Sequence, residues 1–170
     1  LKLYSLDREQ LEAAMAAAHR LGLRTTTHMG VEDANALDVA RLQLTSIEHW
    51  YGIPDAALDG VQDFPPEFSY SNEVHRFRYA GRLWRETRPA KLDAVLDRLV
   101  AAGVAWDPTL AFYEASRDVV RAQNQPWFAD HLHPALAEFF RPSLSSHGSF
   151  FIGWTNRDEV HWKENYRIWM

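Results

Sequence analysis

The sequence predicts an α/β protein built on a parallel sheet. From residue 1 to residue 107, short apolar or β-branched segments alternate with amphipathic helical segments. Two of these helical segments are followed directly by a glycine and then by a strand-like segment, the order expected of successive βα units. Three or four such units do not close a barrel, which needs eight and about 250 residues.

The first unit has the clearest boundaries. Leu1–Tyr4 is short and apolar enough to be the end of a strand. Asp7 is a suitable N-cap for the helix that follows, and Gln10 stands where the second residue of a capping box belongs. Gly22 stands where a C′ glycine ends a helix, and Leu23–His28 then alternates as a strand does.

The unit repeats twice more. Asp33–Arg41 predicts a short helix, and Leu44–His49 predicts a strand whose Thr45, Ile47 and His49 share one face. Pro89 opens a later helix at its first position, and Val104–Trp106 is the next strand. The residues expected to face the core from these helices are Leu37, Ala40, Leu44, Leu92, Val95, Leu96 and Leu99. Near the end of the sequence, Trp162, Tyr166 and Trp169 lie on one face of a helix predicted over Asp158–Met170.

Two long insertions rich in aromatic residues interrupt the units, at about residues 50–88 and 111–157. Their aromatic density argues against disorder. Both follow strands, so we expect both to leave the carboxyl edge of the sheet, where α/β proteins bind ligands, and to cover it as a lid. The side chains that could line a substrate site there are Trp50, Tyr51, Asp107 and Tyr113.

Composition excludes several classes of protein. With 18 Lys+Arg and 23 Asp+Glu, the chain has a net charge of −5. It also lacks a stripe of basic residues, so the sequence does not indicate nucleic-acid binding. No apolar run approaches the roughly 18–20 residues that cross a bilayer. The absence of cysteine excludes a disulfide scaffold, a cysteine-ligated zinc site and a thiol nucleophile, but it does not indicate the compartment.

His28 and His49 are the candidate metal ligands. Each is the last residue of a predicted strand, and they lie 21 residues apart, which is one strand–helix–strand step. In a parallel sheet, this spacing brings both imidazoles to neighbouring strand ends, within reach of one metal ion. A catalytic zinc site needs about three protein ligands and an open position, so two histidines make an incomplete site. The alternative is that each is a hydrogen-bonded histidine near the edge of the core.

Several segments together resemble the second half of the barrel of metal-dependent amidohydrolases, in particular the imidazolonepropionase- and prolidase-like branch. The segments that carry the resemblance are Lys2-Leu3-Tyr4, Ala18-His19-Arg20-Leu21-Gly22-Leu23-Arg24, Thr27-His28, Ser46-Ile47-Glu48-His49 and Asp107-Pro108-Thr109-Leu110. The resemblance runs over Leu1–Leu58 and resumes at about Pro89–Leu110.

The resemblance implies that residues 1–170 form an incomplete (β/α)8 barrel of the TIM type, from about its fourth to its seventh strand, with metal at the carboxyl face. His28 then matches the ligand after the fifth strand and His49 the ligand after the sixth. Lys2 matches a fourth-strand lysine that many members carboxylate to bridge two metals; the alternative is a solvated lysine at a strand end. One or two divalent ions, first of all zinc, are the implied cofactor.

The chain departs from the family pattern in lacking the first-strand His-x-His pair and the eighth-strand Asp that shuttles protons. We therefore expect an internal piece of a longer barrel, inactive alone, whose acid–base residue lies outside the chain and whose site the rest of the barrel completes. Leu1–Tyr4 and Val104–Trp106 should then be edge strands, and Trp162 and Trp169 should be more exposed than is usual in a complete domain.

Two functions remain open at this stage. One is a metal-dependent hydrolase of amide, cyclic amide or peptide-like C–N bonds in a small-molecule substrate, either an amidohydrolase or a dipeptidase, which uses a metal-activated water. The other is a non-catalytic α/β binding module whose aromatic loops hold a partner while both histidines are structural.

Overall fold

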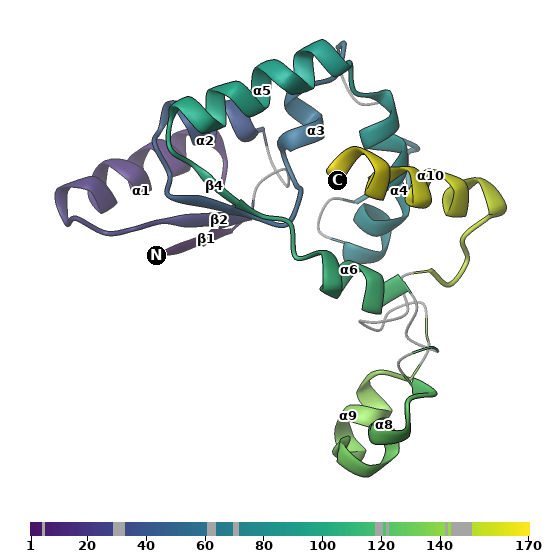
Figure 1. The fold of residues 1–170 in the computed structure, drawn as a ribbon. Helices are drawn as coiled ribbons and strands as arrows, with labels where there is room; N and C mark the ends of the chain where they lie inside the picture. Colours follow the sequence, from purple (N-terminus) through teal and green to yellow (C-terminus); the bar gives the residue numbers. More distant parts are fainter. Residues whose placement is uncertain are drawn as a thin grey trace. The chain divides into compact units, whose positions relative to one another are not determined.

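A computed structural model describes residues 1–4, 6–28, 33–60, 64–69, 72–117, 121, 123–141, 143 and 151–170. Its sheet has four parallel strands in the order β1-β2-β3-β4 (Figure 1). Their bounds are β1 Lys2–Tyr4, β2 Thr26–His28, β3 Ser46–Glu48 and β4 Ala105–Asp107. The predicted α/β class and parallel sheet are confirmed, and β1 and β4 are the edge strands of the described sheet, as expected.

The helices that connect these strands lie on one face of the sheet. Sequential strand order combined with right-handed crossovers requires this arrangement, and Figure 1 draws α1, α2 and α5 on the same side. The helices of this region are α1 Arg8–Arg20, α2 Ala36–Arg41, α3 Ile53–Ala56 and α5 Pro89–Ala101. The helix-facing row of the sheet contains Leu3 and Ile47, both of which are buried.

The predicted ends of α1 are confirmed. The Asp7 carboxylate accepts the Gln10 N–H at 2.8 Å, and the Asp7 N–H donates to Gln10 Oε1 at 3.2 Å. Gly22 follows the helix with a φ of +62°, a conformation that favours glycine.

Helix α2 begins later than the sequence suggested, and its buried face differs from the predicted one. Its N-cap is Asn35, which forms a capping box with Asp38. Its buried apolar residues are Ala36 and Val39, whereas Leu37 is 43% exposed, so the prediction that Leu37 faces the core was wrong. In α5, Pro89 stands at the first turn, and Val95 and Leu99 are buried as predicted.

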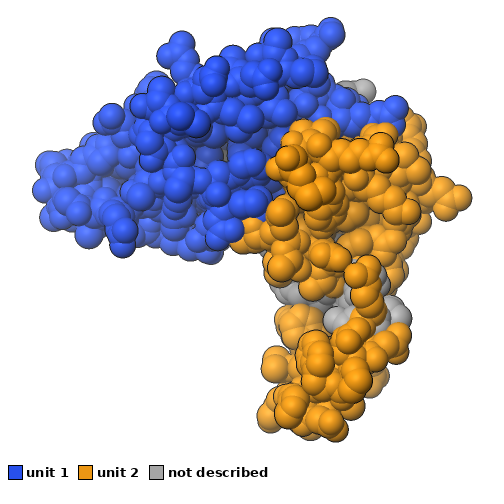
Figure 2. Space-filling view, in the orientation of Figure 1, with its two compact units in different colours: residues 1–71, 83–108 blue, residues 72–82, 109–170 orange. Residues whose placement is uncertain are grey.

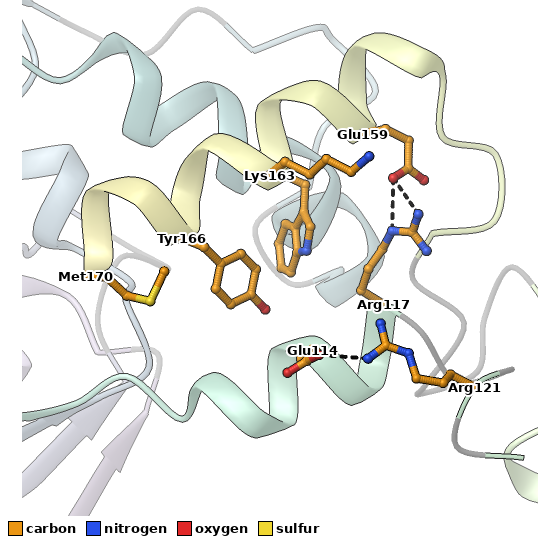
Figure 3. Close-up of a pocket in the computed structure, with 8 residues that line it drawn as sticks. Glu114, Arg117, Arg121, Glu159, Lys163, Tyr166 and Met170 are labelled. Atoms are coloured by element: carbon orange, nitrogen blue, oxygen red, sulfur yellow. Dashed lines mark hydrogen bonds and ion pairs between the residues drawn. The ribbon is translucent and has the colours of Figure 1, made fainter. Parts of the chain in front are cut away.

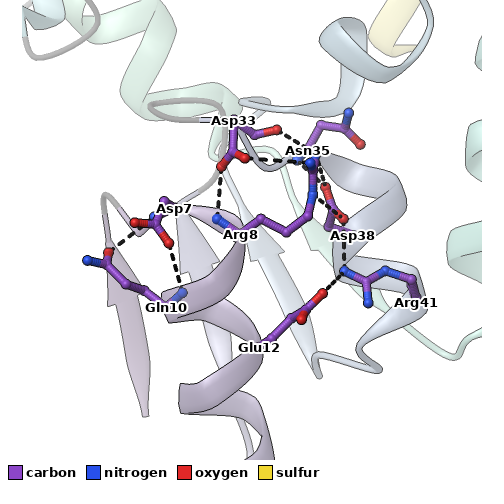
Figure 4. A network of polar contacts seen from close by, with 8 residues as sticks. All are labelled: Asp7, Arg8, Gln10, Glu12, Asp33, Asn35, Asp38 and Arg41. Carbon is purple, nitrogen blue, oxygen red and sulfur yellow. Dashed lines mark hydrogen bonds and ion pairs between the residues drawn. The ribbon is translucent and has the colours of Figure 1, made fainter.

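A polar network joins α1 to α2 (Figure 4). The Arg8 Nε and the Arg41 guanidinium each donate to Asp38 Oδ1 at 3.1 Å, and Arg41 also pairs with Glu12 at 2.6 Å. Burial alone would raise the pKa of Asp38. The hydrogen bonds from Arg8, from the Asn35 backbone and from Arg41 outweigh it, so this pKa is lowered.

The chain divides into two compact units, coloured separately in Figure 2. The first comprises residues 1–71 and 83–108 and contains the sheet; the second comprises residues 72–82 and 109–170. The helices of the remaining sequence are α4 Glu73–Glu86, α6 Leu110–Arg117, α8 Pro126–His131, α9 Pro134–Phe139 and α10 Asn156–Trp169. The described parts of both insertions are therefore largely helical. In the described part of the chain, no helix is both long and apolar enough to cross a membrane.

The core of the second unit is aromatic. The Trp162 ring lies 5.5 Å from that of Phe77 on α4 and 6.0 Å from that of Tyr113 on α6, measured between centroids. On α10 itself, Trp162, Tyr166 and Trp169 contact one another, as their spacing predicted. The expectation that Trp162 would be unusually exposed was wrong: only 3% of it is exposed, because residues of both insertions pack over it.

Candidate functional site

His28 and His49 meet at the carboxyl edge of the sheet. Strands β2 and β3 are parallel neighbours, with Thr26 opposite Ser46 and Thr27 opposite Ile47. The two imidazole centroids lie 4.6 Å apart, with their planes inclined at 68°. The predicted juxtaposition of the two histidines at neighbouring strand ends is confirmed.

The backbone at His49 explains how this contact forms. Alternation had placed His49 on the face of Ile47, which is the face opposite to that of His28. That prediction was wrong, because β3 ends at Glu48 and His49 has a φ of +63°. The His49 N–H donates to the Asp107 carbonyl at 2.8 Å, and the Trp106 indole donates to the His49 carbonyl. These two bonds to β4 hold the left-handed residue in place.

Aromatic rings pack edge-on against the histidine pair. The centroid of Tyr51 lies 4.6 Å from that of His28 and 5.9 Å from that of His49, and the Tyr4 centroid lies 5.4 Å from that of His28. Tyr51 was predicted at this edge, whereas Tyr4 was missed. It ends the first strand and is the register partner of His28, so the strand alignment was the signal that could have identified it.

Lys2 and Glu48 form an ion pair on the same face of the sheet. The Lys2 ammonium also lies 5.1 Å from the centre of the Tyr4 ring. The hydrogen bond to Glu48, with a smaller contribution from Tyr4, raises the pKa of Lys2 and keeps this amine protonated. Strict alternation would point the Glu48 and His49 side chains to opposite faces, but the left-handed turn at His49 puts both on one face.

The strand register reveals a row of polar side chains at the carboxyl end of the sheet. Tyr4 lies opposite His28, and Glu48 lies opposite Asp107. Since Thr27 pairs with Ile47, the next pair along β2 and β3 is His28 with Glu48. Partners in a parallel sheet share a face, so all four strands contribute a polar or titratable side chain at one level.

The substrate-lining candidates fall into two groups. Tyr51 and Asp107 lie at the histidine edge, where Asp107 is exposed but Tyr51 is buried against the two imidazoles. Trp50 is buried, and Tyr113 is fully buried in the second unit, with its centroid 4.8 Å from that of Phe77. These two side chains therefore have core positions and do not line an open surface. The lid formed by both insertions stays a prediction, because it concerns the placement of one unit on the other.

The separation of the two imidazole rings is compatible with two positions around a metal ion. Two imidazoles bound to one tetrahedral zinc ion, each at a Zn–N distance of about 2.0 Å, have ring centres roughly 5 Å apart. The observed 4.6 Å is close to this value. Among the described residues, however, no group of three or more His, Asp or Glu side chains could hold a metal ion. Lys2 as an ammonium ion cannot act as a ligand.

Comparisons of the chain with protein-family models, with curated proteins and with solved structures find no match.

Proposed function

We propose that this chain forms part of a (β/α)8 barrel of a metal-dependent hydrolase and supplies His28 and His49 as two of its metal ligands. The reaction is hydrolysis of an amide, cyclic amide or peptide-like C–N bond in a small molecule, as in amidohydrolases and dipeptidases. The observation that carries the proposal is the contact between the two imidazoles at neighbouring strand ends, whose ring centroids lie 4.6 Å apart. The amidohydrolase-like motifs in which both histidines stand support the same interpretation.

The sheet itself favours a barrel over a doubly wound fold. Its strands follow one another in sequential order, and its helices lie on one face. A doubly wound sheet reverses its strand order at a switch point and carries helices on both faces. The polar row lies on the face of the sheet opposite to the helices, where Tyr4 is 51% exposed. Further strands and loops of the barrel would cover this face and complete the site.

In this proposal, His28 and His49 bind a divalent ion, zinc first of all, through neutral imidazole nitrogens. A bound divalent ion lowers the pKa of water toward neutrality and polarises a carbonyl oxygen. Tyr51 restricts the orientation of both imidazoles, since its ring contacts each of them. Asp107 lies on the same face as His28 and is exposed at this edge of the sheet.

Lys2 can join such a site only in carboxylated form. Carboxylation starts from the neutral amine, adds carbon dioxide to nitrogen and releases a proton. The ion pair with Glu48 opposes the first step because it raises the pKa of Lys2. Lys2 would have to leave Glu48 before carbamate oxygens became ligands, and a carbamate can be detected as added mass in the intact parent protein.

The test is metal binding by the intact parent chain, measured by zinc content and by the visible spectrum of the cobalt-substituted protein. We expect His28→Ala and His49→Asn each to abolish tight binding. Asparagine tolerates positive φ better than most residues, so His49→Asn removes the imidazole while preserving the turn. His19→Ala, on the exposed surface of α1, is the matched control and should retain the metal.

The competing binding-module interpretation predicts a different result. It treats the contacts of His28 with Tyr4 and Tyr51 as ordinary packing. A folded parent that binds no metal at neutral pH, or one whose metal survives both histidine substitutions, would support that interpretation and exclude ours. Chelator-sensitive hydrolysis of an amide panel by the parent, lost in the same two variants, is the expected activity result.

A further inference from the structure

A pocket of about 390 Å³ lies within the second unit, between α6 and α10 (Figure 3). Ligand sites commonly have volumes of about 300–1,000 Å³, so it is large enough for a small organic molecule. Its eight lining residues all belong to the second unit, and none of them belongs to the histidine site. This pocket is therefore separate from the site on which the proposed hydrolase function rests.

The charges around this pocket do not balance. Arg117 donates to Glu159 through Nε at 3.1 Å, and its guanidinium lies 5.4 Å from the centre of the Phe151 ring. Arg121 pairs with Glu114 at 3.2 Å. Each arginine of the lining thus faces a glutamate.

Lys163 is the remaining cation of the lining, and it has no ion-pair partner among the described residues. The pocket therefore carries an excess of one positive charge, on an exposed ammonium group. A pocket with this charge attracts an anion.

Tyr166, one helical turn after Lys163, adds a hydrogen-bond donor. Residues three apart on a helix lie on the same face, so both side chains border the same space. The Tyr166 hydroxyl is buried and has no hydrogen-bond partner among the described residues. Burial, with a smaller contribution from the charge of Glu114, raises the pKa of Tyr166 to about 12. The phenol stays protonated at neutral pH and lacks only an acceptor.

The rest of the lining is apolar. Tyr166 on α10 and Met170, which directly follows this helix, present ring and thioether surface, and Trp162, with 3% of its surface exposed, borders the space only slightly. Aromatic faces and a flexible methionine suit a flat apolar group.

From these observations we propose that the pocket binds a small monocarboxylate with a flat apolar body. The ligand carboxylate pairs with the Lys163 ammonium group. It also accepts a hydrogen bond from the Tyr166 hydroxyl, and the Tyr166 side chain moves slightly to make this bond. The apolar body lies against the Tyr166 ring and the Met170 side chain. A neutral molecule of the same shape gains only the apolar contact and binds more weakly.

The experiment measures the affinity of the full chain for 4-phenylbutyrate and for the uncharged 4-phenylbutan-1-ol. Binding is monitored by NMR, through the chemical shifts of backbone amides. We expect the acid to shift resonances of α6 and α10 and to bind about tenfold more tightly than the alcohol, as expected for one charge-assisted contact. Lys163→Met should abolish this tenfold preference. Arg167→Met removes an exposed positive charge from the same helix outside the pocket, and it should leave the preference intact.

Tyr166→Phe separates a binding role from a structural one. Removing an unpaired buried hydroxyl should leave the protein at least as stable, whereas binding of the acid should weaken several-fold. Equal affinity for acid and alcohol, unchanged affinity in Lys163→Met, or shifts outside α6 and α10 would each overturn the proposal.

Discussion

Substitution of Gly81 by alanine should destabilise the second unit. Gly81 lies inside α4, where it faces the backbone of α10. A Cβ atom at this position would lie 2.5 Å from the carbonyl oxygen of His161 and 2.6 Å from the amide nitrogen of Trp162. Non-bonded heavy atoms prefer separations of about 3.5–4.0 Å, so α10 would have to move away by roughly 1 Å.

Two opposing effects set the size of the change. Alanine is better than glycine in a helix interior by about 1 kcal/mol. Overpacking commonly costs about 1–3 kcal/mol, and this contact should lie at or above the upper end, since a backbone cannot rotate away as a side chain can. Moving α10 also disturbs the packing of Trp162. We therefore expect a net loss of about 2 kcal/mol in the stability of the second unit.

Native-state hydrogen exchange is the suitable measurement because it reports the opening free energy of each helix separately. Gly81→Ala should lower the protection of α10 amides and leave α5, in the first unit, unchanged. Ala94→Gly, at an exposed position of α5, is the matched control and should cost about 1 kcal/mol in α5 alone. A Gly81→Ala protein with α10 protection equal to or above that of the wild type would refute the close helix contact.

Two predictions concern titratable groups. The lowered pKa of Asp38 means that its carboxylate contributes stability fully above the unfolded-state pKa of about 3.9, a contribution lost as pH falls through the lower folded-state pKa. Asp38→Asn should therefore cost about 1–3 kcal/mol at pH 7 and flatten the acid dependence of the urea midpoint; an unchanged acid dependence would contradict the network in Figure 4. Tyr166, with its pKa raised to about 12, should ionise later than an ordinary tyrosine in an ultraviolet titration, and Tyr166→Phe should remove this late component. A titration curve that keeps the late component in Tyr166→Phe would assign the raised pKa to another tyrosine.

The order of strands and helices in the first unit could be predicted from the sequence because local signals determine it. The capping box of Asp7 and Gln10 and the glycine after α1 act within a few residues of one another. The predicted start of α2 at Asp33 was wrong, because Asp33 and Asn35 are both residue types that cap helices and local sequence does not distinguish them. The structure uses Asn35, while Asp33 accepts hydrogen bonds from Arg8 instead.

The aromatic core of the second unit could not be predicted in the same way. Its rings come from α4, α6 and α10, which lie far apart in the sequence. Aromatic density indicated that these segments were ordered but not what they would contact. Trp162 is buried because Phe77 and Tyr113 pack on it. Only the pairing of the helices determines that contact.

The orientation of the His49 side chain depends on residues far from it in the sequence. Strict alternation along β3 points its imidazole toward the helices, away from His28. The observed orientation needs a left-handed residue, which is costly for histidine unless neighbouring groups hold it. Those groups are the Trp106 indole, 57 residues further along the chain, and the Asp107 carbonyl. Only the assembled sheet therefore brings the two imidazoles together.

The register of the strands also bears on whether the polar row at the carboxyl end of the sheet is functional. Glutamate and aspartate are depleted in strands, and a sheet that needed only stability would favour β-branched or aromatic residues at these positions. Tyr4 at the end of β1 fits this preference. The last positions of the other three strands are instead His28, Glu48 and Asp107, directly after a helix-facing row that includes Leu3 and Ile47. Departures from local preference are expected at functional sites, where chemistry takes priority over packing. Three such departures at one level of the sheet, beside a left-handed histidine held by two hydrogen bonds, favour a site over a coincidence of packing. Metal analysis of the histidine variants tests that argument directly.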